Sequence, residues 1–297
     1  MSDPFASIPG GSYKLNSGYY IPLIGFGTYK VTGENVQPAI DAALSAGYRM
    51  FDTAKYYINE KELGEALKVL LPKHGLTRSD VFITSKFFPE SKNSREACRG
   101  FVAESLQSLQ TDYIDMYLVH YPKPNDTDNN DTSNSEYRKI AYEVLEEAQA
   151  SGKVRSIGVS NYEIVHLEEL KTYAKVPPCA NQIEYHPHFA RIPLQKYCKE
   201  NNIFFQAFSS LARHEPKLIN DTVVVELARK HNTSVPLILL AWALRQGVGI
   251  VPKSVTPARI HENFKAIDVQ LTTEEIQALT SLDQGQHYIR CTGWLVK

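Results

Sequence analysis

The sequence lacks any strong imbalance of charge. Among its 297 residues, 32 Lys and Arg nearly balance 33 Asp and Glu, which leaves a formal net charge of −1. Without a basic excess, there is no electrostatic basis for attraction to nucleic acid or to an anionic membrane. Long hydrophobic runs are also missing, because the longest, VPLILLAWAL at 235–244, is about half of what a membrane span needs. We therefore expect neither a nucleic-acid partner nor a membrane partner.

Cysteine is scarce, and the first residues carry no export signal. Cys98, Cys179, Cys198 and Cys291 are scattered and form no CxxC pair, which predicts reduced thiols rather than a disulfide framework. The start MSDPFASIPGG has neither a basic lead nor an apolar core. We therefore expect no signal peptide and a cytoplasmic location.

Three catalytic patterns are absent as well. No serine stands in a GxSxG turn, which disfavours Ser/His/Asp acyl transfer. The stretch EYHPH offers His186 and His188, but no second pair of ligands follows at a suitable spacing, so we predict no metal site. The stretch GFGTYK has two glycines and no third, which disfavours the GxGxxG fingerprint of a Rossmann dehydrogenase.

What the sequence does contain is an eightfold alternation of short β-rich runs with amphipathic helical stretches. This pattern predicts a parallel sheet covered by helices, and its length fits one α/β domain, 1–297, folded as a closed (β/α)8 TIM barrel. Residues 12–23 are typical of a hairpin, 219–231 and 272–282 of two extra helices, and 122–136 of a polar loop. We predict strands at 23–28, 49–54, 80–87, 113–121, 154–161, 180–186, 203–210 and 249–254, and helices at 35–46, 59–71, 94–109, 136–151, 162–174, 193–201, 234–246 and 257–267.

Polar or ionisable residues occupy most of the predicted strand ends. The C-terminal ends of the strands carry the active site in barrels of this type. One such residue alone would be a helix cap, a solvated charge or a hydrogen-bonded core histidine, but their recurrence at one rim indicates a site. The ends carry Asp52, Lys86, His120, Ser160–Asn161, Asn181–Gln182, Phe208–Ser209 and Lys253–Ser254.

Three of these rim residues, together with Tyr57, suggest a specific chemistry. A carboxylate that ends a buried strand needs a partner, and Lys86 on the neighbouring strand can pair with Asp52. Tyr57 follows closely, and a nearby ammonium is expected to lower the pKa of its phenol toward a useful range. His120 would supply a second hydrogen bond to the same substrate oxygen. Such a set polarises a carbonyl and donates a proton but has no nucleophile, so a hydride must come from a cofactor.

Motifs along almost the whole chain resemble those of the aldo-keto reductase family. One motif falls in nearly every β/α unit, and their order and spacing make the resemblance specific. They are GFGT at 25–28, DTAKYYINEKELGEAL at 52–67, ITSK at 83–86, YLVHYP at 117–122, GVSNY at 158–162, NQIEYHP at 181–187 and IVPKSVTPARIHENF at 250–264.

The resemblance implies reduction of aldehydes and ketones with NADPH, by a protein that we expect to be a monomer with a small carbonyl substrate. Tyr57 would be the general acid, tuned by Asp52 and Lys86, and His120 would orient the carbonyl. The cofactor positions follow by residue-for-residue match. They are Ser160, Asn161 and Gln182 for the nicotinamide carboxamide, Phe208 for its ring, Ser209 at the start of the pyrophosphate cradle, Lys253, Ser254 and Arg259 for the adenosine 2′-phosphate, and Glu262 and Asn263 for the adenine.

The sequence departs from the family pattern at several places near the predicted pocket. Phe208 occupies a position where the family commonly has Tyr, and Tyr121 one where it commonly has Trp. The stretch SSLAR at 209–213 replaces the more common Ser-Pro-Leu-Gly. The loop 122–136 and the tail 283–297 are short for specificity loops, which predicts a more open pocket. A non-catalytic barrel that retains a cofactor site is the alternative, and the complete set of Asp52, Tyr57, Lys86 and His120 favours the enzyme.

Overall fold

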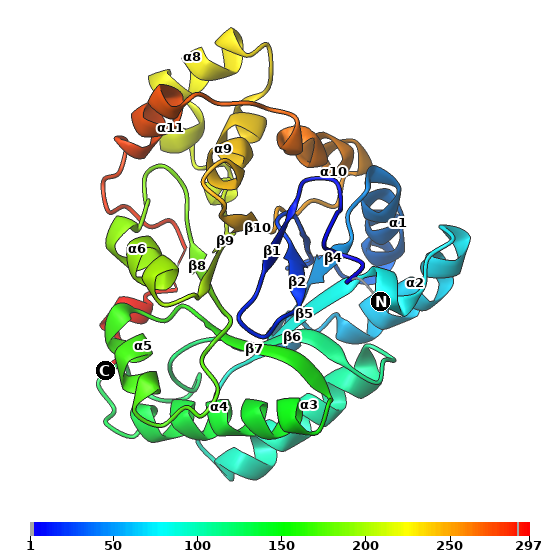
Figure 1. Ribbon diagram of the computed structural model, residues 1–297, viewed down its shortest axis with the longest axis vertical. Coiled ribbons are helices and arrows are strands. Elements are labelled where there is room, and N and C mark those ends of the chain that lie inside the picture. Colours follow the sequence, from blue (N-terminus) through cyan, green and yellow to red (C-terminus); the bar gives the residue numbers. More distant parts are fainter. Residues whose placement is uncertain (1–2, 290) are drawn as a thin grey trace.

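The computed structural model describes residues 3–289 and 291–297, and their strands form a closed parallel barrel (Figure 1). Consecutive strands pair with one another in chain order, and a bridge between Ile24 and Ile250 joins the last strand to the first. The predicted barrel is therefore confirmed. Its strands are β3 (Phe26–Gly27), β4 (Met50–Asp52), β5 (Phe82–Phe87), β6 (Ile114–Val119), β7 (Val154–Ser160), β8 (Ala180–Glu184), β9 (Phe204–Phe208) and β10 (Gly249–Ile250).

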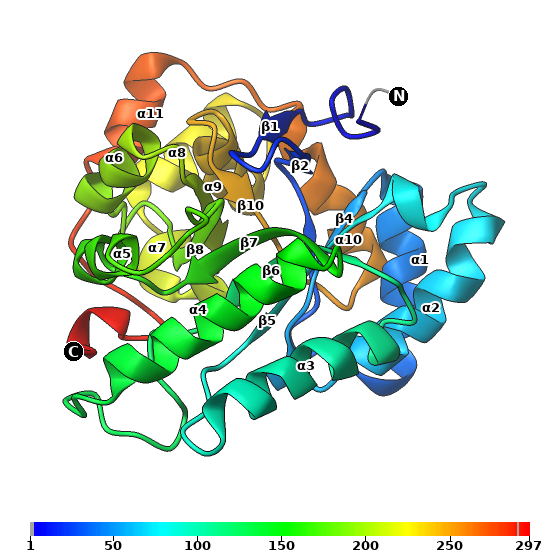
Figure 2. The ribbon, with the colours of Figure 1, turned by 60° about the horizontal axis from the view of Figure 1, so that its bottom comes forward.

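Helices alternate with the strands and surround the barrel (Figures 1 and 2). The eight that follow strands are α1 (Val36–Ala46), α2 (Glu60–Lys73), α3 (Ser94–Ser108), α4 (Asn134–Ala150), α5 (Ile164–Lys171), α6 (Ile192–Glu200), α9 (Val235–Leu244) and α10 (Pro257–Phe264). The two predicted extra helices are present as α8 (Thr222–Lys230) and α11 (Thr273–Thr280), with a short α7 (Pro216–Ile219) before α8. None of the helices in the described residues combines the length and hydrophobicity that crossing a bilayer requires.

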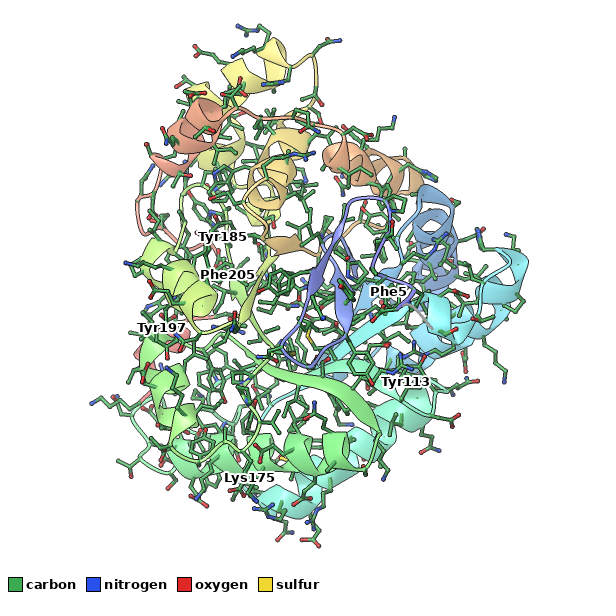
Figure 3. All side chains as sticks on the ribbon, in the orientation of Figure 1. Phe5, Tyr113, Lys175, Tyr185, Tyr197 and Phe205 are labelled. Carbon is green, nitrogen blue, oxygen red and sulfur yellow. The ribbon has the colours of Figure 1, made fainter. Side chains whose placement is uncertain are left out.

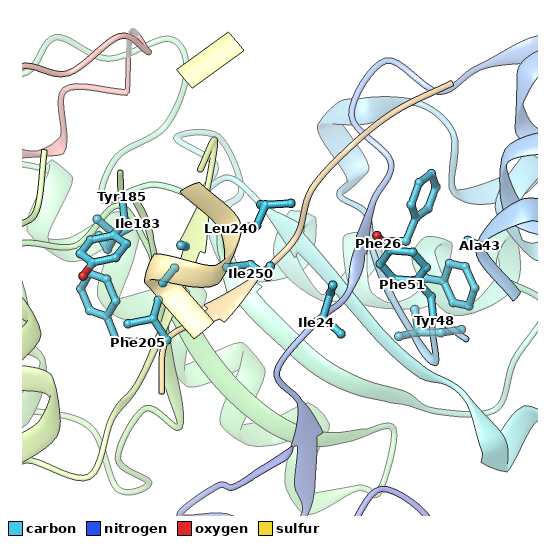
Figure 4. Packing of buried hydrophobic residues seen from close by; sticks show 14 of the residues in the cluster. Ile24, Phe26, Ala43, Tyr48, Phe51, Ile183, Tyr185, Phe205, Leu240 and Ile250 are labelled. Carbon is cyan, nitrogen blue, oxygen red and sulfur yellow. The ribbon is translucent and has the colours of Figure 1, made fainter. Parts of the chain in front are cut away.

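Alternation along the strands divides the core into an inner and an outer part, because successive side chains point to opposite faces. Phe51 of β4 faces outward and packs in an aromatic cluster with Phe26 and Tyr48 beside α1 (Figure 4). On the opposite side of the barrel, Tyr185 packs edge-on against Phe205 (Figure 3). Tyr185 also stacks on Trp242 of α9. Burial of such large aromatic surfaces between sheet and helices supplies much of the driving force for folding.

The inner part of the core is closed at one end by the predicted N-terminal hairpin. Strands β1 (Ser12–Lys14) and β2 (Tyr20–Pro22) pair antiparallel, and Leu15 and Ile21 of this hairpin cluster with residues near the starts of the barrel strands, such as Phe82 and Phe204. The hairpin therefore covers the N-terminal end of the barrel (Figure 2). A site open to solvent must lie at the other end, where the strands finish.

The seam of the barrel contains its shortest strands. The predicted strands 23–28 and 249–254 are too long, because regular pairing covers only two residues in each of β3 and β10. Gly27 lies so close to the other side of the seam that a Cβ atom there would stand 2.6 Å from the carbonyl oxygen of Val251. Only glycine permits this approach. Lys253 and Ser254 consequently follow β10 in irregular structure rather than ending a strand.

Candidate active site

Strand alternation directs four polar side chains into the C-terminal end of the barrel. Each stands two positions beyond a residue with the same inward orientation, so together they form a polar layer above the apolar inner core. They are Asp52 after Met50, Lys86 after Thr84, Gln182 after Ala180 and Gln206 after Phe204. All four polar side chains are buried.

The predicted pairing of Asp52 with Lys86 is confirmed by the geometry. The Lys86 Nζ atom lies 2.7 Å from the Asp52 Oδ1 atom and also donates a hydrogen bond of 2.9 Å to the carbonyl oxygen of Thr53. The amide of Gln182 donates to the other carboxylate oxygen at 2.8 Å and to Gln206 Oε1 at 2.7 Å. A buried charge is tolerated when its hydrogen-bonding capacity is met in this way.

Tyr57 lies next to this ion pair in a short 3-10 turn, Lys55–Tyr57. Its hydroxyl oxygen is 3.4 Å from Lys86 Nζ, and its ring packs against Tyr29. Burial, reinforced by the negative charge of Asp52, raises the pKa of Tyr57 well above 10. The lowering expected from Lys86 was therefore wrong for this state, because that argument omitted desolvation. The phenol is held protonated, as a proton donor must be.

His120 follows β6 and faces the same phenol. Its ring contacts that of Tyr57 edge-on, with centroids 5.8 Å apart, and lies over Phe88. Burial, together with the charge of Lys86, lowers the pKa of His120 well below 6.5, so its imidazole is neutral. Its Nδ1 atom is buried and has no hydrogen-bond partner among the described residues. A neutral imidazole can donate one hydrogen bond to a substrate oxygen.

A cavity of about 760 Å³ opens beside Tyr57. This volume is in the range of small-molecule sites. Aromatic residues are the largest group in its wall, which also contains two lysines and two acidic residues. The lining residues include Tyr29, Tyr56, Phe87, Phe88 and Phe101 among the aromatics, and Lys30, Lys55, Glu90 and Asp126 among the charged groups.

The residues predicted to hold the nicotinamide lie together beside His120. The Ser160 hydroxyl donates to the carbonyl oxygen of Gln182 at 2.8 Å, and the Asn161 amide donates to the carbonyl oxygen of His120 at 2.9 Å. Asn161 adopts a left-handed backbone with φ of 62°, which asparagine tolerates better than most residues. Phe208 ends β9 close by and is half-buried.

The segment after Phe208 departs from regular geometry. Ser209, Ala212, Arg213 and His214 all have positive φ, a conformation that costs a non-glycine residue energy and that persists only where the surroundings enforce it. The guanidinium of Arg213 lies 5.9 Å from the centre of the ring of Tyr29, which lines the cavity. The Ser210 hydroxyl is buried and makes no hydrogen bond within 3–289 and 291–297.

Basic side chains gather at the predicted adenosine end. Burial and the nearby charge of Lys30 lower the pKa of Lys253, and Arg259 is exposed in the first turn of α10. Within the described residues, none of these three cations forms an ion pair with an acidic residue. Glu262 and the buried Asn263 follow on the same helix. Cations left without acidic partners beside a helix N-terminus fit a phosphate-bearing cofactor.

Several residues of the site were missed by the sequence analysis. Gln206 is the polar member of an apolar strand, and the strand period alone could have placed it in the site. Asn59 fixes the turn that carries Tyr57, because its amide donates to the carbonyl oxygens of Thr28 and Val31. No residue pattern could have revealed Glu184, whose partners lie at the far end of the chain. In the parts of the chain that the structure covers, no three His, Cys, Asp or Glu side chains are grouped to hold a metal ion.

The strand ends of the closed barrel thus bring together a buried acid–lysine pair, a phenol held protonated and a neutral imidazole. The chain belongs to the aldo/keto reductase family, whose model matches residues 23–284.

Individual relatives agree over nearly the full length. The chain is 35% identical to the glyoxal reductase of Bacillus subtilis (strain 168), over 92% of this chain and 93% of that protein. It is 36% identical to the aldo-keto reductase family 1 member A1 of Bos taurus, over 93% of this chain and 90% of that protein. Among solved structures, MGS-M4, an aldo-keto reductase enzyme from a Medee basin deep-sea metagenome library, superposes with a TM-score of 0.84 at 34% identity, covering 93% of this chain and 96% of that one.

Proposed function

We propose that this protein reduces aldehydes and ketones to alcohols by hydride transfer from NADPH, with Tyr57 as the general acid. The observation that carries the proposal is the contact between the buried Lys86–Asp52 pair and the Tyr57 hydroxyl, at the edge of an aromatic cavity. When bound, NADPH supplies the hydride that these side chains cannot provide.

The roles of the other residues follow from their protonation states. Tyr57 remains protonated and can give its proton to the oxygen of the carbonyl as negative charge develops there. His120 is neutral and can donate a second hydrogen bond to that oxygen. The Lys86 ammonium, fixed by Asp52, stabilises the phenolate that Tyr57 becomes after it has donated its proton.

The cofactor would lie along the rim from Tyr57 to α10. Ser160, Asn161 and Gln182 would hold its carboxamide and Phe208 its nicotinamide ring, with Ser209 beside the pyrophosphate. The adenosine end would be held by Lys253, Ser254, Arg259, Glu262 and Asn263. The cations at that end support a preference for NADPH, because NADH lacks the 2′-phosphate with which they would pair.

Replacing Tyr57 with phenylalanine tests the proposal directly. The variant Tyr57→Phe removes one hydroxyl and keeps the ring that packs on Tyr29. We expect kcat for NADPH-dependent reduction of 4-nitrobenzaldehyde and methylglyoxal to fall roughly 10²–10⁴-fold, while NADPH binding survives. The matched control is Tyr19→Phe, which changes an exposed tyrosine of the N-terminal hairpin, away from the cavity.

The possible outcomes separate the two readings of the barrel. A Tyr57→Phe variant that keeps more than half of the wild-type kcat would remove Tyr57 from the general-acid role. A wild-type protein that binds NADPH but reduces no member of a panel of aldehydes, ketones and sugars would instead favour the non-catalytic barrel.

A further inference from the structure

A second buried carboxylate lies close to the candidate active site, outside the barrel wall. Glu60 is the first residue of α2, shortly after Tyr57 in the chain, and its side chain is buried. Its Oε1 atom accepts a hydrogen bond of 2.5 Å from the Ser85 hydroxyl, and its Oε2 atom accepts one of 2.9 Å from the Ser105 hydroxyl. The proposed reaction makes no use of this carboxylate. A buried acidic group with such a defined set of partners needs a separate explanation.

Ser85 connects this carboxylate to the strand that carries Lys86. The two residues are neighbours in β5, and both are fully buried. Because successive side chains point to opposite faces of a strand, Ser85 faces α2 whereas Lys86 faces the inside of the barrel. A displacement of Ser85 must therefore move the backbone from which Lys86 extends.

Glu60 itself belongs to the short segment that carries Tyr57. Tyr57 ends a 3-10 turn, Ile58 adopts a left-handed backbone with φ of 57°, and α2 begins after Asn59. The left-handed conformation is costly for a β-branched residue and persists only where the surroundings enforce it. Asn59 attaches the segment to the loop after β3 through its side-chain amide. Glu60 provides a separate attachment, to β5.

The second serine partner, Ser105, fixes the carboxylate against α3 and β6. The Ser105 Oγ atom also lies 2.7 Å from the phenol oxygen of Tyr117, which is paired with Ser85 across β5 and β6. Helix α2 packs on α3 so closely that a Cβ atom on Gly64 would stand 2.5 Å from the carbonyl oxygen of Ser108. The carboxylate thus lies in a closely packed layer between the sheet and two helices, where it has little freedom to move relative to β5.

The charge of Glu60 also acts on Lys86 through the barrel wall. Burial lowers the pKa of Lys86, and the charges of Asp52 and Glu60 both oppose that lowering. Burial likewise raises the pKa of Glu60, and the two serine hydroxyls that donate to it oppose that rise. Hydrogen bonds donated to a carboxylate favour its ionised form. The ammonium that contacts Tyr57 is therefore supported by one carboxylate inside the barrel and one outside it.

We propose that Glu60 is a positioning residue that sets the contact between Tyr57 and Lys86, because it links the segment carrying the phenol to the strand carrying the ammonium. This inference rests on the proposed reductase function, and Glu60 itself lies outside the cavity. The distance of 3.4 Å between Lys86 Nζ and the Tyr57 hydroxyl is long for a hydrogen bond, so a small displacement decides whether the contact is made. Loss of the link should slow proton donation and leave the cavity and the cofactor positions intact.

The variant Ser85→Ala tests the link without changing any residue of the site. It removes one hydroxyl that faces away from the barrel interior. We expect the chemical step, measured in single turnovers of enzyme premixed with NADPH and then mixed with 4-nitrobenzaldehyde, to slow roughly tenfold. KM for the aldehyde and Kd for NADPH should change less than about twofold. The matched control is Ser156→Ala, which removes the hydroxyl of a buried serine of β7 that contacts Ser17 of the N-terminal hairpin, and it should leave the rate unchanged.

A spectroscopic measurement reports the contact itself, independently of turnover. In protein labelled with ¹³C at the Cζ carbon of tyrosine, the Tyr57 signal is the one that disappears in Tyr57→Phe. Because this carbon carries the phenol oxygen, its chemical shift responds to the hydrogen bond from Lys86. We expect the signal to move in Ser85→Ala and to stay in place in Ser156→Ala. The variant Glu60→Gln removes the charge and one acceptor oxygen, so it should have the same two effects, and it serves if Ser85→Ala does not fold.

Each outcome is decisive. A shifted Tyr57 signal together with a slower chemical step, at unchanged KM and Kd, supports the proposal. An unmoved signal overturns the positioning role, and so does a shifted signal with a wild-type rate. A slower step with a comparable rise in KM and Kd would indicate a general loosening of the fold and would also overturn it. A wild-type protein that reduces no carbonyl compound, but whose signal shifts in Ser85→Ala, would refute the reductase function and leave the link through Glu60 intact.

Discussion

Replacing Lys86 with methionine perturbs the ion pair on which the proposed chemistry depends. The Lys86 side chain is fully buried and that of Asp52 is 4% exposed, so the variant Lys86→Met leaves a carboxylate in the barrel without its cation. Breaking a buried pair on one side costs roughly 3–5 kcal/mol of unfolding free energy. For a chain of this size that corresponds to a decrease in Tm on the order of 10 °C.

A second substitution separates the structural effect from the chemical one. In Asp52→Asn/Lys86→Met the buried charge is gone, together with the hydrogen bond that Lys86 donates to the Thr53 carbonyl oxygen. Replacing both partners of a buried pair is close to neutral for stability. We expect the double variant to regain most of the lost stability. Its kcat should remain low, because no ammonium is present to stabilise the Tyr57 phenolate.

The assay is urea unfolding at pH 7 of the wild type, both single variants and the double variant, with kcat measured for each folded protein. Stability that returns in the double variant while kcat does not is the expected result. If Lys86→Met is as stable as the wild type, then the variant does not leave a destabilising, unpaired carboxylate at Asp52. A double variant with wild-type kcat would show that the pair has no part in catalysis.

Three further changes have defined outcomes. Arg259→Ala should weaken the binding of NADPH roughly ten- to a hundredfold and leave the binding of NADH unchanged. Lys265→Ala, at an exposed position, is the control, and equal weakening of the binding of both cofactors would contradict the prediction. Burial lowers the pKa of His166 to about 4, whereas in the unfolded chain the imidazole binds its proton below about pH 6.5. The contribution of His166 should therefore lower the unfolding free energy by about 3 kcal/mol between pH 6.5 and pH 4. A His166→Gln variant with the same pH profile in urea titrations would contradict this. Ala212→Gly removes the backbone strain of a positive φ of 44°, at some cost in the conformational entropy of the unfolded chain. We therefore expect the unfolding free energy, measured by urea titration, to rise by up to about 1 kcal/mol. A clear decrease would contradict the prediction.

The parts of the site that the sequence predicted are those set by local rules. Asp52 and Lys86 could be paired from the order of the residues alone, because each lies at the end of a strand with its side chain on the inward face and the strands are neighbours in a βαβ unit. His120 could be placed because it follows an apolar strand directly. The barrel itself followed from the eightfold alternation, although α4 begins at Asn134, two residues before the predicted helix.

The features that could not be predicted depend on distance through space or on burial. Lys253 and Ser254 were assigned to a strand end, but the regular pairing of β10 with β9 stops at Ile250. The direction of the Tyr57 pKa shift depends on desolvation, which no motif displays. Glu184 contacts Tyr288 across more than a third of the chain, so nothing near it in the sequence identifies this contact.

The seam between Ile24 and Ile250 also determines when this protein can complete its fold during synthesis. The two bridging residues lie far apart in the sequence, so β3 has no partner on its outer edge until Ile250 has been synthesised. Non-local closure of this kind slows folding, and domains that wait for a late strand expose unpaired backbone meanwhile. A nascent or truncated chain that stops before Gly249 would present the free edges of both β3 and β9, and such edges can pair with those of another copy.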